Sequence, residues 1–170
     1  MPNWCEGSLK VRGKPSDILR FVKEGLNVYT DSMDAPMDKD LWLKIKDYGT
    51  EVIIFFDHSN IPKYSSIYIE GTVRAFILWE SFNDIFVDVT KQIEMVPFGF
   101  KQAWGINPDE FVPIADKYDL DIRLYGIEHG MGFVQDYEIL DRGQNIIDHA
   151  PLYASYNEFD WDCPFPWMGG

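Results

Sequence analysis

The sequence predicts an α+β fold in which one antiparallel sheet carries helices on one face. Two observations predict it: strand, helix and strand patterns follow one another at both ends of the chain, and the second set runs into a hairpin. The 170 residues are 46% hydrophobic and 16% aromatic, which is enough apolar material for one well-filled core. We therefore expect a single domain over residues 1–170.

The N-terminal block predicts a strand, a short turn and a helix. Polar and apolar residues alternate over residues 8–12, which is the period of a half-buried strand. Pro15 suits the first turn of a helix, because an N–H there has no partner within the helix. Apolar residues follow at helical spacing over residues 18–22, and Gly25 is suited to end the helix.

The middle segment, residues 27–92, predicts a divergent insertion within this domain. Aspartates and a proline over residues 27–50 indicate an exposed loop. The apolar run within residues 51–57 indicates a buried strand, and residues 67–69 indicate a short one. Apolar residues from Ala75 to Val89 fit one helix face, so we expect an amphipathic helix over about residues 73–90.

The last block repeats the order of the first. Residues 93–100 predict a strand, and Asn107 with Pro108 predicts the start of a helix that Pro113 kinks. Residues 120–125 predict another strand, and residues 133–140 and 144–149 predict a C-terminal hairpin. Two such units in one antiparallel sheet form the ferredoxin-like plan, followed here by an aromatic and acidic tail over residues 150–170.

Both ends also carry a family resemblance. The run Met1-Pro2-Asn3-Trp4-Cys5-Glu6, followed by Leu9-Lys10-Val11-Arg12-Gly13, resembles the opening of the YubB-type ferredoxin-like proteins of phages and plasmids. In the second half, Trp104, Pro108 and Glu128-His129-Gly130 are similar to that family as well. The resemblance implies a ferredoxin-like fold and an origin in a mobile element, and it transfers no catalytic residues.

Charge is distributed unevenly along the chain. Residues 1–23 hold five Lys and Arg against two acids, whereas residues 102–170 hold three against thirteen, and the whole chain has a net charge of −13. Such a field repels phosphate and attracts basic surfaces. We therefore expect a partner protein with a basic surface, and no direct binding of nucleic acid. The acids expected to contact the partner are Asp109, Glu110, Asp116, Asp119 and Asp121.

The tail interleaves acids with large aromatic residues. Asp160, Trp161, Asp162 and Trp167 are candidates for partner binding, because aromatic side chains often anchor a segment in a partner's pocket. The alternative is that these rings fold back onto the sheet, since so many exposed rings would favour aggregation. The sequence leaves both open.

The sequence contains candidate metal ligands but no metal-binding motif. Each of the three histidines follows an acid, and Glu128, His129, Asp148 and His149 could share a metal ion if the fold brought them together. Carboxylates two residues apart share a strand face and could hold Mg²⁺. Such pairs occur at Asp119/Asp121, Asp136/Glu138 and Asp160/Asp162. The usual ligand spacings are absent from the sequence, so we expect no cofactor.

These patterns favour a non-enzymatic protein of a phage or other mobile element. It would bind a host protein through an acidic surface as a nucleic-acid mimic, for example to inhibit host defence as anti-CRISPR proteins do. One alternative is a small metal-dependent hydrolase or nuclease. Another is a phage structural or assembly protein that forms homo-oligomers through an edge strand. We expect it in the cytoplasm of a bacterial host, without a membrane span, and with Cys5 and Cys163 as free thiols or as one disulfide.

Overall fold

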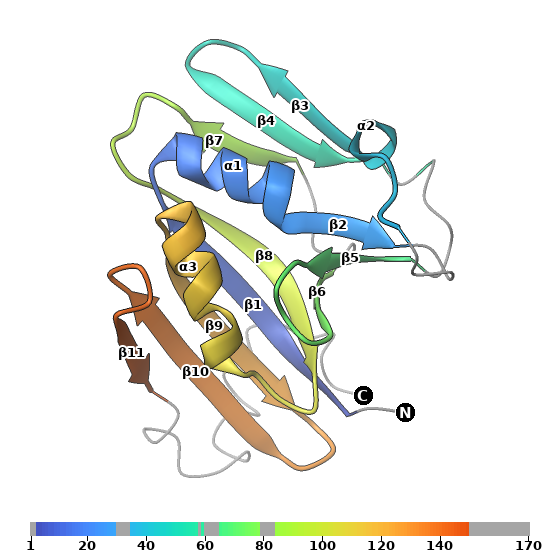
Figure 1. The fold of residues 1–170 in the computed structure, drawn as a ribbon, viewed down its shortest axis with the longest axis vertical. Helices are drawn as coiled ribbons and strands as arrows, with labels where there is room; N and C mark the ends of the chain where they lie inside the picture. Colours follow the sequence, from blue (N-terminus) through green and yellow to red (C-terminus); the bar gives the residue numbers. More distant parts are fainter. Residues whose placement is uncertain (1–2, 30–34, 58, 60–64, 79–83, 150–170) are drawn as a thin grey trace.

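The computed structural model describes residues 3–29, 35–57, 59, 65–78 and 84–149. In this part of the chain, strands outnumber helices (Figure 1). The elements are, in order, β1 (Trp4–Gly13), α1 (Pro15–Gly25), β2 (Leu26–Tyr29), α2 (Lys39–Trp42), β3 (Leu43–Asp47), β4 (Glu51–Phe56), β5 (Ser66–Ile69), β6 (Ala75–Ile77), β7 (Ile85–Asp88), β8 (Glu94–Ala103), the 3-10 turn η3 (Pro108–Glu110), α3 (Val112–Tyr118), β9 (Asp121–Glu128), β10 (Phe133–Leu140) and β11 (Asn145–Asp148).

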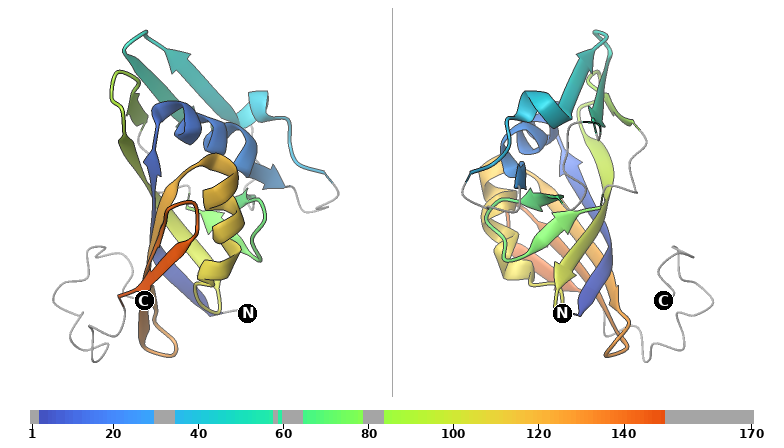
Figure 2. Two further views of the ribbon diagram at one scale, coloured as in Figure 1. Left: turned by 60° about the vertical axis from the view of Figure 1, so that its left-hand side comes forward. Right: turned by 90° about the vertical axis from the view of Figure 1, so that its right-hand side faces the viewer.

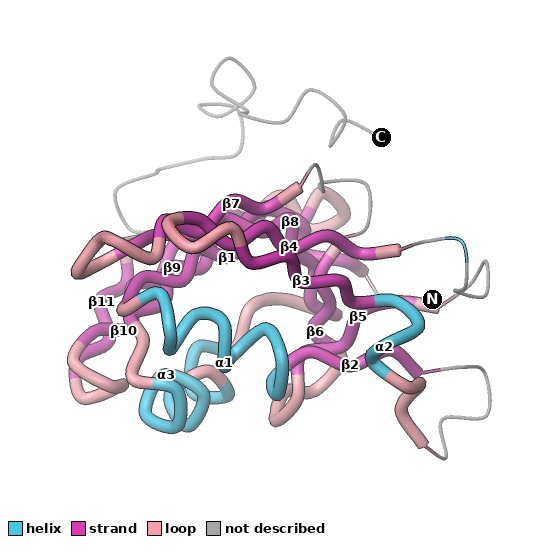
Figure 3. The backbone as a smooth tube through the Cα atoms, turned by 90° about the horizontal axis from the view of Figure 1, so that it is seen from above, coloured by secondary structure: helices cyan, strands magenta, loops and turns pink. Residues whose placement is uncertain are grey.

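The main sheet has eight strands in the order β11-β10-β9-β1-β8-β6-β5-β2, and neighbouring strands are antiparallel. The long strands β1, β8 and β9 form its centre. Helices α1 and α3 lie side by side on one face, which Figures 1 and 3 show from two directions. The opposite face of the central strands carries alternate residues such as Trp4, Lys10 and Arg12.

A second sheet, in the order β3-β4-β7, extends beyond the main sheet near α1 (Figures 1 and 2). Alternate residues of β4 are buried, namely Val52, Ile54 and Phe56, and Phe56 stacks on the buried Trp42 of α2 with ring centroids 5.8 Å apart. The apolar residues of both sheets belong to one hydrophobic cluster.

Helix α1 forms and packs as its sequence predicts. Proline stands in its first turn, and Ile18, Phe21 and Val22 point into the core at helical spacing. The Phe21 ring meets Tyr118 of α3 and Phe98 of β8 edge to face, at centroid distances of 5.5 and 6.3 Å. This three-ring contact joins both helices to the sheet.

The prediction of a ferredoxin-like α+β fold is wrong. Strands β5 and β6 stand between β8 and β2 in the main sheet, and three further strands form a separate sheet. The segment expected to be an insertion therefore supplies β2, β5 and β6 to the main sheet and all of the second one. Sequence patterns report which segments are strands, but the number of strands that join a sheet depends on pairings between distant segments.

Two local predictions in the middle segment are also wrong. The expected helix over residues 73–90 contains strands β6 and β7, where the buried residues are two apart: Ala75 with Ile77, and Ile85 with Val87. These positions satisfy a strand period as well as a helical one, and pairing in the sheets decides between them. The expected loop over residues 27–50 contains β2, α2 and β3, which are too short to be stable alone.

The C-terminal elements follow the prediction more closely. Strands β10 and β11 pair as the expected hairpin. The helix expected after Asn107 is split into η3 and α3, which places Pro113 in the first turn of α3, where a missing N–H costs nothing, rather than in a kinked interior.

Candidate functional site

Strand pairing brings the basic N-terminal segment against the acidic C-terminal one. Strand β1 pairs with β9 in a register that places Arg12 opposite Asp121. The Arg12 guanidinium donates two hydrogen bonds to Asp121 Oδ2, from Nη2 at 2.7 Å and from Nε at 3.1 Å. Charges that are segregated along the sequence therefore meet in the fold and partly neutralise each other.

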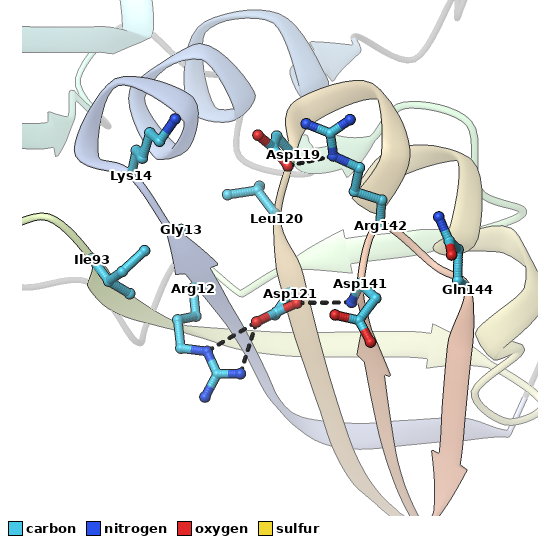
Figure 4. Close-up of a pocket in the computed structure, with 10 residues that line it drawn as sticks. All are labelled: Arg12, Gly13, Lys14, Ile93, Asp119, Leu120, Asp121, Asp141, Arg142 and Gln144. Carbon is cyan, nitrogen blue, oxygen red and sulfur yellow. Dashed lines mark hydrogen bonds and ion pairs between the residues drawn. The ribbon is translucent and has the colours of Figure 1, made fainter.

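A cavity of about 660 Å³ lies at this end of β1 (Figure 4). We call it the charged groove and define it by the six charged residues that line it: Arg12, Lys14, Asp119, Asp121, Asp141 and Arg142. The exposed side chain of Ile93 and the buried Leu120 add apolar surface. A smaller cavity of about 230 Å³ shares Arg12 and Asp121 with the groove and continues along the open face of the sheet towards Arg123.

Left-handed backbone shapes two walls of the groove. Asp119 ends α3 with φ of 56°, and Asp141, Arg142 and Gly143 form the β10–β11 turn with φ of 52°, 59° and 82°. Non-glycine residues adopt this conformation at a cost of roughly 1–2 kcal/mol each. A Cβ atom on Gly143 would lie 2.7 Å from Val112 Cγ1, so the turn also needs glycine for its close approach to α3.

The turn carries Arg142 to Asp119, and Arg142 Nε donates to Asp119 Oδ1 at 2.6 Å. This hydrogen bond lowers the pKa of Asp119 below its ordinary value and raises the pKa of Arg142. The negative charges of Asp116 and Asp17 also raise the pKa of Arg142. The backbone N–H of Asp141 donates to Asp121 Oδ1 at 3.2 Å. The carboxylates of Asp119 and Asp121 are thus both oriented by hydrogen bonds, which the dashed lines in Figure 4 mark.

The five acids predicted to contact a partner fall into three places. Asp119 and Asp121 line the charged groove. Asp109 and Asp116 are exposed on η3 and α3. Glu110 is internal to a loop network, since its carboxylate accepts hydrogen bonds from Val73 N, Gln102 Nε2 and Asn107 Nδ2.

The four tail residues predicted to contact a partner, Asp160, Trp161, Asp162 and Trp167, lie outside the described residues. The groove itself contains residues that the sequence did not single out: Arg12, Lys14, Asp141 and Arg142. Their separation explains this, because Arg12 and Asp121 are 109 positions apart. The sequence did indicate that Arg12 and Asp121 each stand on a predicted strand at a position that faces away from the core.

The metal candidates are not brought together. The buried Glu128 carboxylate accepts N–H groups of its own turn, from Gly130 at 2.9 Å and from Met131. Strand β10 stands between the candidate pair Glu128/His129 and the candidate pair Asp148/His149. Phe133 of β10 lies opposite Glu128, whereas the backbone oxygen of Asp136, farther along β10, accepts a hydrogen bond from His149 N. Those two β10 positions are roughly 10 Å apart at the rise of a strand. Among the described residues, no three His, Cys, Asp or Glu side chains are placed to share a metal ion.

Two of the three predicted carboxylate pairs bind arginine, but the prediction that Asp119 shares a strand face with Asp121 is wrong, because Asp119 ends α3 and β9 begins at Asp121. Asp136 and Glu138 both contact Arg123, at 2.9 and 3.2 Å, and each member of Asp119/Asp121 has its own arginine. Asp160/Asp162 lies outside the described residues. The positive charge that Mg²⁺ would supply at the first two pairs is supplied by guanidinium groups.

Cys5 is a buried free thiol. Burial, assisted by the negative charge of Glu128, raises its pKa to about 12. The thiolate is the reactive form of cysteine, so this residue is unsuited to nucleophilic catalysis at neutral pH. Its expected alternative partner, Cys163, lies outside the described residues.

Comparison with protein-family models, with curated proteins and with solved structures finds no match for this chain. The resemblance to YubB-type proteins therefore stays a prediction. None of the described helices has the length and apolar composition needed to span a membrane.

Proposed function

We propose that this protein acts by binding a partner protein, without catalysis, and that the charged groove is the centre of the contact. The observation that carries the proposal is the pair of arginine-held carboxylates, Arg12–Asp121 and Arg142–Asp119, which present both signs of charge in fixed positions. A rigid pattern of alternating charge selects a partner with the complementary pattern.

The partner is expected to be basic overall. The net charge of −13 favours association with a positively charged surface and increases the rate of encounter. Asp109 and Asp116 are exposed on η3 and α3, and Asp116 acts on Arg142 of the groove, so these two acids extend the contact. In the most specific form of the proposal, the partner is a host protein whose basic surface otherwise binds nucleic acid. The acidic protein would then be the product of a mobile element and would inhibit this host protein.

Affinity capture from host lysate at low and high salt tests this function. We expect one nucleic-acid-binding protein to be retained at low salt, released at high salt and displaced by added DNA or RNA. The double variant Asp109→Lys/Asp116→Lys should lower its recovery at least tenfold. The matched control, Glu24→Lys/Asp40→Lys, makes the same change in net charge on other elements and should leave recovery within twofold of the unmodified protein.

Two results would contradict the proposal. If both double variants reduce recovery equally, then net charge and not this surface drives the association. If no protein is retained in a salt-dependent way, then the groove is not a protein-binding site under these conditions, and a homo-oligomer detected by light scattering would become the better explanation.

A further inference from the structure

A group of aromatic and cationic side chains lies at the end of β1 opposite the charged groove. We call it the Trp–Arg cluster and define it as Trp4, Arg74, Lys101 and Trp104. The Arg74 guanidinium lies over two rings, 5.0 Å from the Trp104 centroid and 5.7 Å from the Trp4 centroid. Lys101 Nζ lies 4.9 Å from the Trp4 centroid. The cluster thus combines two indole rings with two positive charges.

An aromatic row continues from the cluster across the open face of the main sheet, the face away from α1 and α3. Its rings belong to four strands and are all half-buried: Trp4 of β1, Phe76 of β6, Tyr68 of β5 and Tyr29 of β2. Successive centroids along the row are 5.9, 5.7 and 5.8 Å apart. Strand pairing places Lys101 of β8 beside Phe76, so a cation stands next to the rings.

Strained backbone and a polar network hold the cluster in place. Arg74 and Trp104 both have left-handed backbone, with φ of 55° and 65°. The buried Gln102 side chain donates from Nε2 to Glu110 Oε2 at 2.8 Å. Because Glu110 also accepts from Val73 N at 2.8 Å, the network fastens the β5–β6 turn, which carries Arg74, to the loop that begins at Trp104. Strained residues that are held in this way commonly occur at binding sites.

The two cations of the cluster are available to an anion. The other four arginines of the chain each form an ion pair with a carboxylate: Arg12, Arg20, Arg123 and Arg142. Within the described residues, Arg74 and Lys101 form no such pair, although the chain has 28 acids against 15 Lys and Arg. A guanidinium group that lies over rings keeps its N–H donors at its edge, where they can bind phosphate oxygens in pairs.

Trp104 supplies a surface for a flat group beside these cations. Its side chain is 62% exposed, which is unusual for so large an apolar ring. Arg74 covers one face of the indole and leaves the other face for a second stacking contact. Nucleobases stack on such rings irrespective of sequence, because every base has a π face. A phosphate group for the cations and a base for the ring are the two parts of one nucleotide.

The net charge of −13 opposes nucleic acid, but many of the acids lie far from the cluster. Exposed acids such as Glu24 and Asp116 lie on α1 and α3, on the opposite face of the sheet (Figure 3). A helix with its side chains is about 10–12 Å thick, whereas the Debye length is about 8 Å at physiological ionic strength. The charged groove begins at Arg12, about 26 Å along β1 from Trp4 at the rise of a strand. These charges are therefore largely screened at the cluster.

We propose that the Trp–Arg cluster binds a short single strand of nucleic acid, with a base stacked on Trp104 and a phosphate group bound by Arg74 and Lys101. The aromatic row offers rings to a neighbouring base, as open sheet faces with exposed aromatic residues do. The site goes beyond the proposed function and is independent of the charged groove. It departs from the expectation that the chain binds no nucleic acid, because that expectation follows from the charge of the whole chain and not from the charges near one site.

Fluorescence anisotropy of a labelled single strand of ten deoxythymidines, measured with the full chain, tests this inference. Two phosphate contacts predict a slope of about −1.4 for log K against log salt, so the affinity should fall roughly sevenfold between 50 and 200 mM salt. Arg74→Gln should weaken binding about tenfold and halve this slope. Trp104→Ala should weaken binding at least about fivefold and leave the slope unchanged. The matched control Arg20→Gln removes one positive charge from α1 and should leave the affinity within twofold.

Glu6→Gln tests the site in the opposite direction. Strand pairing places Glu6 beside Lys101 on the open face. Removing its negative charge should therefore strengthen binding of the same probe by about twofold or more. Glu24→Gln, the matched control on α1, should leave the affinity unchanged.

Urea denaturation shows whether each variant is folded. If the strained positions Arg74 and Trp104 do not tolerate substitution, Lys101→Gln decides, because Lys101 stands in the regular strand β8. Absence of binding at low salt would overturn the inference, as would equal weakening by Arg74→Gln and Arg20→Gln. A peptide of alternating Glu and Trp that binds at least tenfold more tightly than the oligonucleotide, and only with Arg74 present, would assign the cluster to an acidic protein segment and would equally overturn it.

Discussion

The two ends of β1 use arginine in opposite ways. At the charged groove, Arg12 donates hydrogen bonds to Asp121 and Arg142 donates to Asp119. These bonds orient the two carboxylates and offset their negative charge. At the Trp–Arg cluster, Arg74 is held by the rings of Trp4 and Trp104. The position of a cation in the sequence therefore does not reveal its role. An arginine paired with carboxylate orients an acidic surface, whereas one held by rings retains its donors for a ligand.

The largest effect is expected from Gly7→Ala in the middle of β1, which should disrupt both ends at once. A Cβ atom there would lie 1.9 Å from the backbone oxygen of Tyr125, so β1 and β9 could not keep their register. We expect the free energy of unfolding to fall by about 3 kcal/mol, as for severe overpacking. Urea denaturation measures this loss. Ser8→Ala is the control, and an equal loss in both variants would show that close packing of the strands is not the cause.

Glu110→Ala should affect only the end of β1 that carries Trp4. It removes the acceptor of the Val73 N–H and the closer of the two acceptors of the buried Gln102 amide, which keeps only Val73 O at 3.4 Å, and we expect a loss of about 2 kcal/mol. Hydrogen exchange should accelerate around residues 72–75 and 102–107 and stay unchanged at the β10–β11 turn. Asp109→Ala, one residue away on the exposed side of η3, should cost less than about 0.5 kcal/mol. A uniform acceleration over both ends would contradict the separation of the two sites.

Substitutions of Trp104 separate the contribution of its ring from the strain of its backbone. Both Trp104→Ala and Trp104→Gly remove the contact with Arg74, but only glycine relieves the left-handed conformation at φ of 65°. We expect the glycine variant to be more stable than the alanine variant by about 1 kcal/mol. Thermal and urea unfolding of the pair check this difference. Equal stability would mean that the loop relaxes once the ring is gone.

The smallest effect concerns the pH dependence of the charged groove. Arg142 lowers the folded-state pKa of Asp119, so the stabilisation from this pair is fully present above the unfolded value of about 3.9 and is lost as the pH falls through the folded-state pKa. An NMR titration of the Asp119 carboxyl should show a midpoint below that unfolded value, and Arg142→Gln should raise it. An unchanged midpoint in the variant would show that Arg142 does not hold this carboxylate in solution.

Prediction from sequence succeeded where the signal was local. The alternation of β1, the proline-led α1 with its apolar stripe, and the β10–β11 hairpin each depend on residues within a few positions of one another. Apolar residues between Ala75 and Val89 fit both a helix and two strands, and only pairing with β5, β8 and β4 selects the strands. A helix makes its backbone hydrogen bonds within one segment, whereas a short strand makes them with neighbouring strands and is stable only beside them.

By itself, the sequence determined the overall acidity, the apolar content for a core and the elements at both ends. The tertiary structure decided how many strands join each sheet, that Arg12 would meet Asp121 across 109 positions, and that Arg74 would lie over the rings of two tryptophans. The physical reason is that strand order and register arise from contacts between distant segments. Each such contact depends on the rest of the sheet being in place, and no periodicity within one segment encodes it.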